Sequence, residues 1–96
     1  MEYRNRLREV LESKFAIYVL LLIKEQSEDP NIKCNKTTIF SAEKGNERTK
    51  FLRIRDLMDV GLVERDFSQI NHNTIYLQLT PKGKKVAYLL ESALEA

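Results

Sequence analysis

The chain of 96 residues is long enough for one domain with a modest core, and its hydrophobic content of 43% is typical of a globular protein. The formal net charge is only +2, which excludes a protein that coats nucleic acid by bulk charge, so any contact with DNA must come from a local basic patch. The single cysteine, Cys34, excludes an internal disulfide and favours a reducing, intracellular (cytoplasmic) compartment.

The first 27 residues contain neither glycine nor proline, so they are predicted to form one long helix, or two helices joined near Ser13. The nine-residue run from Phe15 to Ile23 is apolar throughout. A helix of that length spans about 13 Å, against roughly 30 Å for a bilayer core, so we expect a buried helix and no membrane partner. A helix that is apolar on every side needs neighbours on every side. A single chain of 96 residues has few other helices to supply them, so residues 1–27 are expected to form part of a homodimer interface.

A helix-turn-helix is predicted over residues 35–60. Asn35 is expected to cap a helix at 36–44, a turn follows at 45–46, and a basic helix is expected at 47–60. The apolar residues of this basic helix recur at i, i+3 and i+4 spacing and are expected to face the core; they are Phe51, Ile54, Leu57 and Met58.

The opposite side of the basic helix is then free to contact a ligand. Its outward residues are expected to be Thr49, Leu52, Arg53 and Asp56, with Arg48 and Lys50 on the flanks. The basic residues precede the acids Asp56 and Asp59, so positive charge gathers toward the N-terminal part of the helix. The alternative is a solvated face on which Arg53 and Asp56, three residues apart, simply pair.

A two-stranded wing is predicted to follow. Gly61 is expected to end the helix by adopting φ > 0. Residues 62–67 and 74–79 are expected to form antiparallel strands around a polar turn at 68–73.

A last helix is predicted at 81–95. Thr80 supplies the oxygen that caps it, and Pro81 fits the first helical position, where a missing N–H costs nothing. The apolar side of this helix is expected to pair with the N-terminal helix or with a second subunit.

Two short motifs link these elements to a known family. Leucine at 57 followed by Gly-Leu-Val at 61–63, and Leu-Thr at 79–80 followed by Gly83, are similar to the ends of the recognition helix and of the second wing strand in winged-helix transcription regulators of the MarR, PadR and ArsR type. The chain resembles these regulators from about Phe15 to Leu90. The resemblance implies an α+β, mostly α, winged helix-turn-helix fold with a three-helix core, a two-stranded wing, a C-terminal helix and an extended N-terminal helix. It implies one domain over residues 1–96, with the helix-turn-helix at 35–60, the wing at 61–80 and the last helix at 81–95.

The resemblance also implies sequence-specific binding of double-stranded DNA by a homodimeric regulator of prokaryotic or viral type. The helix at 47–60 would lie in the major groove, and the wing at 62–79 would lie on the backbone or in the minor groove. Two copies, joined through the N-terminal and C-terminal helices, would bind a pseudo-palindromic site. The residues expected to contact DNA are Lys36, Thr37, Thr38, Arg48, Thr49, Lys50, Arg53, Arg65, Asn71, His72 and Asn73.

Each group of these residues has a physical reason and a plainer alternative. Arg48 and Arg53 can bind guanine O6 and N7 or a phosphate. The N-terminus of the helix at 36–44 favours a phosphate, although Asn35 alone can cap it. The turn residues at 71–73 can donate hydrogen bonds to DNA, or can form a polar hairpin turn without any ligand.

A winged-helix adaptor that binds a protein rather than DNA is the second hypothesis, because one fold serves several functions. The low net charge and the absence of lysine and arginine from the wing turn favour it. Catalysis, a cofactor and a metal site are not expected, because the chain has one histidine, one cysteine and no ligand spacing typical of a metal.

Overall fold

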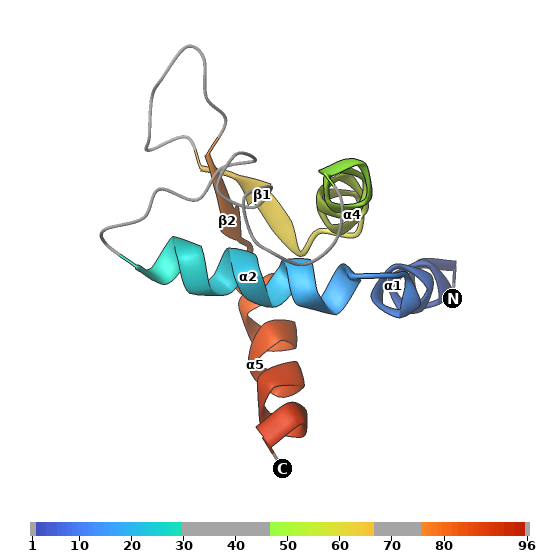
Figure 1. Cartoon of the computed structure of the whole chain (residues 1–96). Coiled ribbons are helices and arrows are strands. Elements are labelled where there is room, and N and C mark those ends of the chain that lie inside the picture. The colour runs from blue at the N-terminus through green and yellow to red at the C-terminus, as the bar shows by residue number, and fades with distance from the viewer. Residues whose placement is uncertain (1, 30–46, 67–75, 96) are drawn as a thin grey trace.

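The computed structural model describes residues 2–29, 47–66 and 76–95, shown in colour in Figure 1. In these ranges the chain is mostly helical and carries one two-stranded antiparallel sheet. The elements are α1 (Glu2–Glu12), α2 (Ala16–Glu28), α4 (Glu47–Asp59), β1 (Val63–Arg65), β2 (Leu77–Leu79) and α5 (Pro81–Glu95). The predicted α+β winged-helix architecture is confirmed. The helix and short strand expected between 30 and 46 lie outside the described residues.

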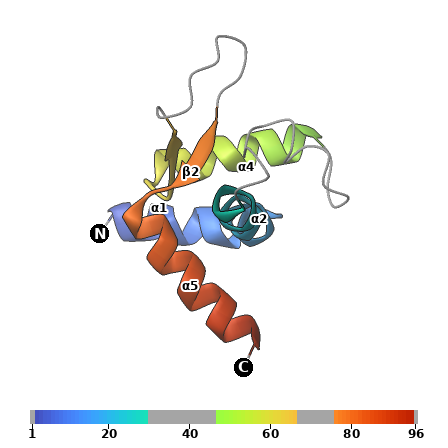
Figure 2. The same cartoon turned by 90° about the vertical axis from the view of Figure 1, so that its left-hand side faces the viewer.

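Helix α2 is the centre of the fold. It contacts α1, α4, α5 and β2, and Figures 1 and 2 show that it separates α5 on one side from α4 and the sheet on the other. Its residues Val19, Leu20 and Ile23 are fully buried in the common core. The neighbours that an all-round apolar helix needs therefore come largely from the same chain, so the apolar run from Phe15 to Ile23 does not by itself require a second subunit.

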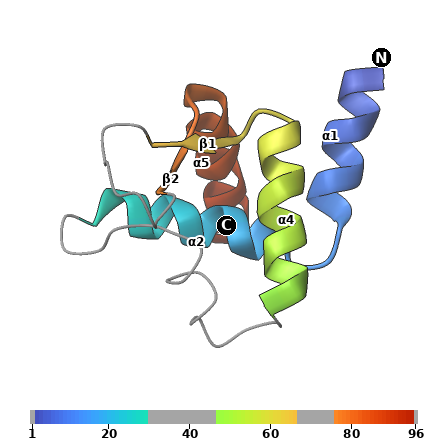
Figure 3. The ribbon, with the colours of Figure 1, turned by 90° about the horizontal axis from the view of Figure 1, so that it is seen from above.

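The N-terminal segment is two helices, not one. The second of the two predicted alternatives is confirmed, because α1 ends before Ser13 and α2 starts at Ala16. The break is at Phe15, whose φ of 66° lies in the left-handed region that bulky residues rarely adopt. The Phe15 ring packs edge-on against Tyr18, with 6.4 Å between ring centroids, and the ammonium of Lys14 lies 5.2 Å from its centroid. These contacts hold the turn that lays α1 alongside α4 (Figure 3).

Helix α4 is terminated by Gly61, as the sequence predicts. Gly61 has φ 78°, its N–H donates to the Met58 carbonyl at 3.0 Å, and the Leu62 N–H donates to the Leu57 carbonyl at 3.0 Å. This pair of bonds is a Schellman motif, which satisfies carbonyls that the helix end would leave open. The chain then enters β1, whose Val63 pairs with Leu79 of β2, so the predicted wing pairing is confirmed in the described part.

Thr80 joins the wing to the last helix. Its hydroxyl accepts a hydrogen bond from the Gly83 N–H at 2.9 Å, as predicted for a helix cap, and donates one to the Gly61 carbonyl at 2.6 Å. Its own N–H donates to the Leu62 carbonyl at 3.1 Å. Gly83 is buried so closely against Leu62 that a Cβ added there would overlap the Leu62 carbonyl oxygen. The two sequence motifs therefore pack against each other, and their contacts connect the end of α4 to the start of α5.

None of the helices in the three described ranges is long and apolar enough to cross a membrane.

Candidate nucleic-acid interface

Burial divides α4 into an inner and an outer side. Lys50, Ile54 and Leu57, spaced i, i+4 and i+7, are buried. The exposed residues are Arg48, Phe51, Leu52, Arg55, Met58 and Asp59. The prediction that Phe51 and Met58 face the core is wrong, because their side chains are 40% and 39% exposed. The helix is turned so that its buried stripe runs through Lys50 instead.

Lys50 was predicted to contact DNA from the flank of the helix, and this prediction is wrong. Its side chain is 0% exposed. Lys50 precedes Ile54 by four residues and therefore lies on the same side of the helix. The whole lysine side chain, ammonium included, is buried, which a count of formal charge does not reveal.

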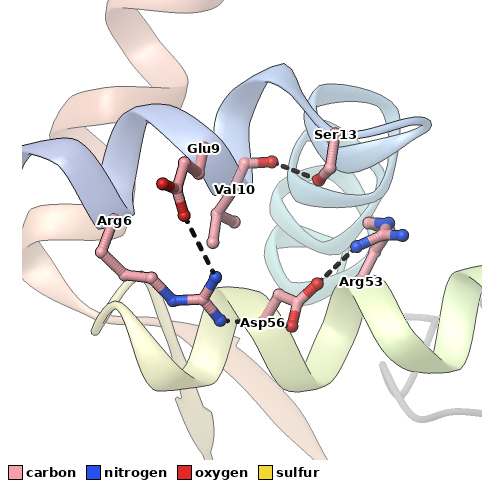
Figure 4. Close-up of polar contacts among 6 residues, drawn as sticks. All are labelled: Arg6, Glu9, Val10, Ser13, Arg53 and Asp56. Atoms are coloured by element: carbon pink, nitrogen blue, oxygen red, sulfur yellow. Dashed lines mark hydrogen bonds and ion pairs between the residues drawn. The ribbon is translucent and has the colours of Figure 1, made fainter.

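Arg53 does not point to the outside either. Its guanidinium forms an ion pair with Asp56 (Figure 4), and the two side chains are only 20% and 24% exposed. Asp56 is also approached from α1, because its Oδ1 lies 3.7 Å from Nη2 of Arg6, which in turn pairs with Glu9 at 3.8 Å. The alternative in which Arg53 and Asp56 pair is the one that the structure has, and the prediction of a base contact by Arg53 is corrected.

Two arginines of α4 remain on the exposed side. Arg48 was predicted to contact DNA, and Arg55 was not, although both are exposed. They are seven residues apart, which is about two turns, so their side chains leave the same side of the helix. That i, i+7 spacing is the signal that would have found Arg55. Thr49, also predicted, is half-buried.

The wing contributes fewer described residues. Arg65 is exposed at the end of β1, opposite Leu77 of β2. Next to it, the Gln78 amide donates to the Glu64 carboxylate at 3.0 Å, across the two strands. The predicted contacts at residues 36–38 and 71–73 lie outside the described residues. In the described ranges, no group of three or more potential metal ligands gathers.

No protein-family model matches the sequence, and a search of curated proteins finds no match. Solved structures do match. A possible HxlR family transcriptional factor from Thermoplasma volcanium superposes with TM-score 0.73 at 24% identity, covering 93% of this chain and 75% of that one. A protein from Archaeoglobus fulgidus gives 0.73 at 25% identity, covering 92% and 93%.

A complex of S. aureus MepR with DNA also superposes, with TM-score 0.69 at 15% identity, covering 96% of this chain and 72% of that one. At these identities the likeness shows the fold. It agrees with the geometry above, in which a helix with an exposed basic side leads into a two-stranded wing. The chain thus has the winged-helix fold of the HxlR, MarR, SlyA and MepR transcription regulators.

Proposed function

We propose that this protein is a non-enzymatic transcription regulator that binds double-stranded DNA in a sequence-specific way. In this proposal α4 lies in the major groove and the wing lies on the backbone or in the minor groove. The observation that carries it is the outer side of α4, where Arg48 and Arg55 are both exposed. The winged-helix fold supports it, because structural neighbours include a regulator solved on DNA.

The charges of α4 support the same orientation. Asp56 is held by Arg53 and Arg6 and faces α1, so its negative charge is matched within the protein. Asp59 is exposed, but it stands at the C-terminal end of the helix. The described outer side from Arg48 to Arg55 is thus left with positive charge, and it includes N-terminal turns of the kind with which helix-turn-helix proteins contact base edges. Working on DNA, a prokaryotic protein of this kind would act in the cytoplasm.

We further propose that two copies pair through α5 and the N-terminal helices. Leu89 and Leu94 of α5 are 57% and 69% exposed, and Tyr88 beside them is also exposed. Helix α5 extends away from α4 on the far side of α2 (Figure 2). A partner on α5 would cover this apolar surface and leave both copies of α4 open, about 34 Å apart, for a pseudo-palindromic site.

Selection of bound fragments from a random DNA pool tests the DNA proposal. The expected result is an enriched, symmetric sequence whose affinity falls steeply with salt, because phosphate contacts release counterions. If no fragment is enriched and no gel shift occurs at micromolar protein and low salt, the DNA proposal fails. The adaptor hypothesis would then stand, and the exposed Phe51 and Leu52 of α4 are the observation that favours it.

Light scattering tests the dimer separately. The monomer mass is 11.2 kDa, and a mass of twice that value is expected at micromolar concentration. Leu94→Glu should shift the protein toward monomer. Met58→Glu is the matched control, because Met58 is also an exposed apolar residue but lies on α4, away from α5. A monomer mass for the unmodified protein would contradict the dimer while leaving DNA binding open.

A further inference from the structure

The outer side of α4 is as apolar as it is basic. Leu52 is 38% exposed, and Phe51 and Met58 are exposed to the same extent. Among the described residues, the large hydrophobic side chains with this exposure occur only on α4 and α5. Water disfavours such a group of apolar side chains, so their presence beside arginines points to a partner that offers both charge and apolar surface.

Leu52 lies between the two exposed arginines. It follows Arg48 by four residues and precedes Arg55 by three, and those spacings put all three side chains on neighbouring positions of one helix side. Along the helix axis the separations are about 6 Å and about 4.5 Å. Each is between one and two base-pair steps of about 3.4 Å.

The major groove offers a matching pattern. Guanine presents the acceptors O6 and N7, which arginine binds, and thymine presents a C5-methyl group, the apolar group on its edge. Resting on the proposed function, we infer that Leu52 is a specificity-determining residue that contacts the methyl group of a thymine, between the positions that Arg48 and Arg55 bind. The preferred DNA site then carries thymine at a fixed position in each half-site.

The charge on the outer side of α4 favours DNA over a protein as its partner. A protein docking on Leu52 and Phe51 would also meet the exposed guanidinium groups of Arg48 and Arg55, whereas DNA brings phosphates and guanine acceptors to them. Among the described side chains of α4, the acid exposed on the same side is Asp59, which is seven residues beyond Leu52 and near the end of the helix. The order arginine, leucine, arginine therefore fits DNA, which is a polyanion and carries methyl groups on its thymine bases.

Replacement of thymine by uracil tests the inference, because it removes the methyl group and leaves the base-pair hydrogen bonds in place. In the enriched DNA site, each thymine is replaced in turn and the affinity is measured. We expect one position per half-site at which uracil weakens binding about fourfold, the value of one buried methyl group. In Leu52→Ala, thymine and uracil should bind equally at that position.

Met58→Ala is the matched control, because Met58 is exposed on the same helix but nearer its C-terminal end. This variant should keep the fourfold preference. Equal affinity of the unmodified protein for thymine and uracil at every position overturns the inference while DNA binding stands. A preference that survives Leu52→Ala, or that is lost in Met58→Ala, overturns the assignment to Leu52. If no DNA fragment is enriched at all, the proposed function fails and the inference fails with it.

Discussion

The carboxylate of Asp56 joins two helices, because it pairs with Arg53 on its own helix α4 and lies 3.7 Å from the guanidinium of Arg6 on α1 (Figure 4). Arg53 is four-fifths buried in this arrangement, and its Nε has no hydrogen-bond partner among the residues that the structure describes. The guanidinium thus depends on Asp56 for compensation of its charge. This contact fixes α4 against α1, and α4 is the helix that the proposed function places in the DNA groove.

Asp56→Asn should destabilise the protein by about 1–3 kcal/mol, between the values for exposed and fully buried ion pairs. The reason is that the largely buried Arg53 would lose its counter-charge. Urea unfolding measures the change, and Asp59→Asn is the control, because Asp59 is exposed on the same helix. Equal stability of the two variants would show that the Asp56 pairs contribute nothing measurable.

Arg53 and Arg55 should differ in the salt dependence of DNA binding. Each phosphate contact contributes about 0.9 to the slope of log K against log salt concentration. Arg55→Gln should therefore reduce the slope, by about one where the exposed Arg55 binds a phosphate and by less where it binds a guanine edge. Arg53→Gln should leave the slope unchanged, even where affinity falls through misplacement of α4. A slope reduced by Arg53→Gln would mean that Arg53 leaves Asp56 to contact DNA.

Gly83→Ala should destabilise the protein by about 3 kcal/mol or more, because the added Cβ would overlap the Leu62 carbonyl and push α5 away from the wing. Gly61→Ala is the informative comparison. The space around Gly61 is open, so its cost of about 1–2 kcal/mol should come from the left-handed backbone alone. Thermal unfolding of both variants tests this order. A Gly83→Ala variant as stable as the unmodified protein would contradict the close contact between Gly83 and Leu62.

The sequence was most informative where backbone geometry restricts residue type. Gly61 needs φ > 0, Gly83 needs room against Leu62, and Thr80 needs a side-chain oxygen, so each leaves a signature that can be recognised in one sequence. These positions predicted the end of α4, the wing and the start of α5.

Tertiary contacts decided the rest. The sequence predicts a junction near Ser13 as one alternative but does not point to Phe15, because phenylalanine disfavours positive φ and its packing with Tyr18, Lys14 and the core compensates. The rotation of α4 about its axis differs from the predicted one for a similar reason. The sequence assigns Phe51 to the core as an apolar residue and Lys50 to the surface as a charged one, whereas the fold buries the whole lysine side chain and leaves Phe51 40% exposed. The candidate site changed accordingly, with Arg55 gained and Lys50 and Arg53 lost.

The link between α2 and α5 should show itself at alkaline pH. The ammonium of Lys24 donates to Glu91 at 3.0 Å and to Glu28 at 3.2 Å, and these bonds, that to Glu91 first, raise the pKa of Lys24. A raised lysine pKa stabilises the folded state fully below the unfolded value of about 10.4, and the contribution is lost as pH rises through the folded pKa. Lys24→Met should therefore lower the free energy of unfolding by up to about 1 kcal/mol between pH 7 and pH 9. The difference from the unmodified protein should shrink above about pH 10 in urea unfolding. Lys85→Met is the control, because Lys85 is exposed. If the stability difference between Lys24→Met and the unmodified protein stays constant to pH 11, packing of the lysine stem and not its charge holds the two helices together.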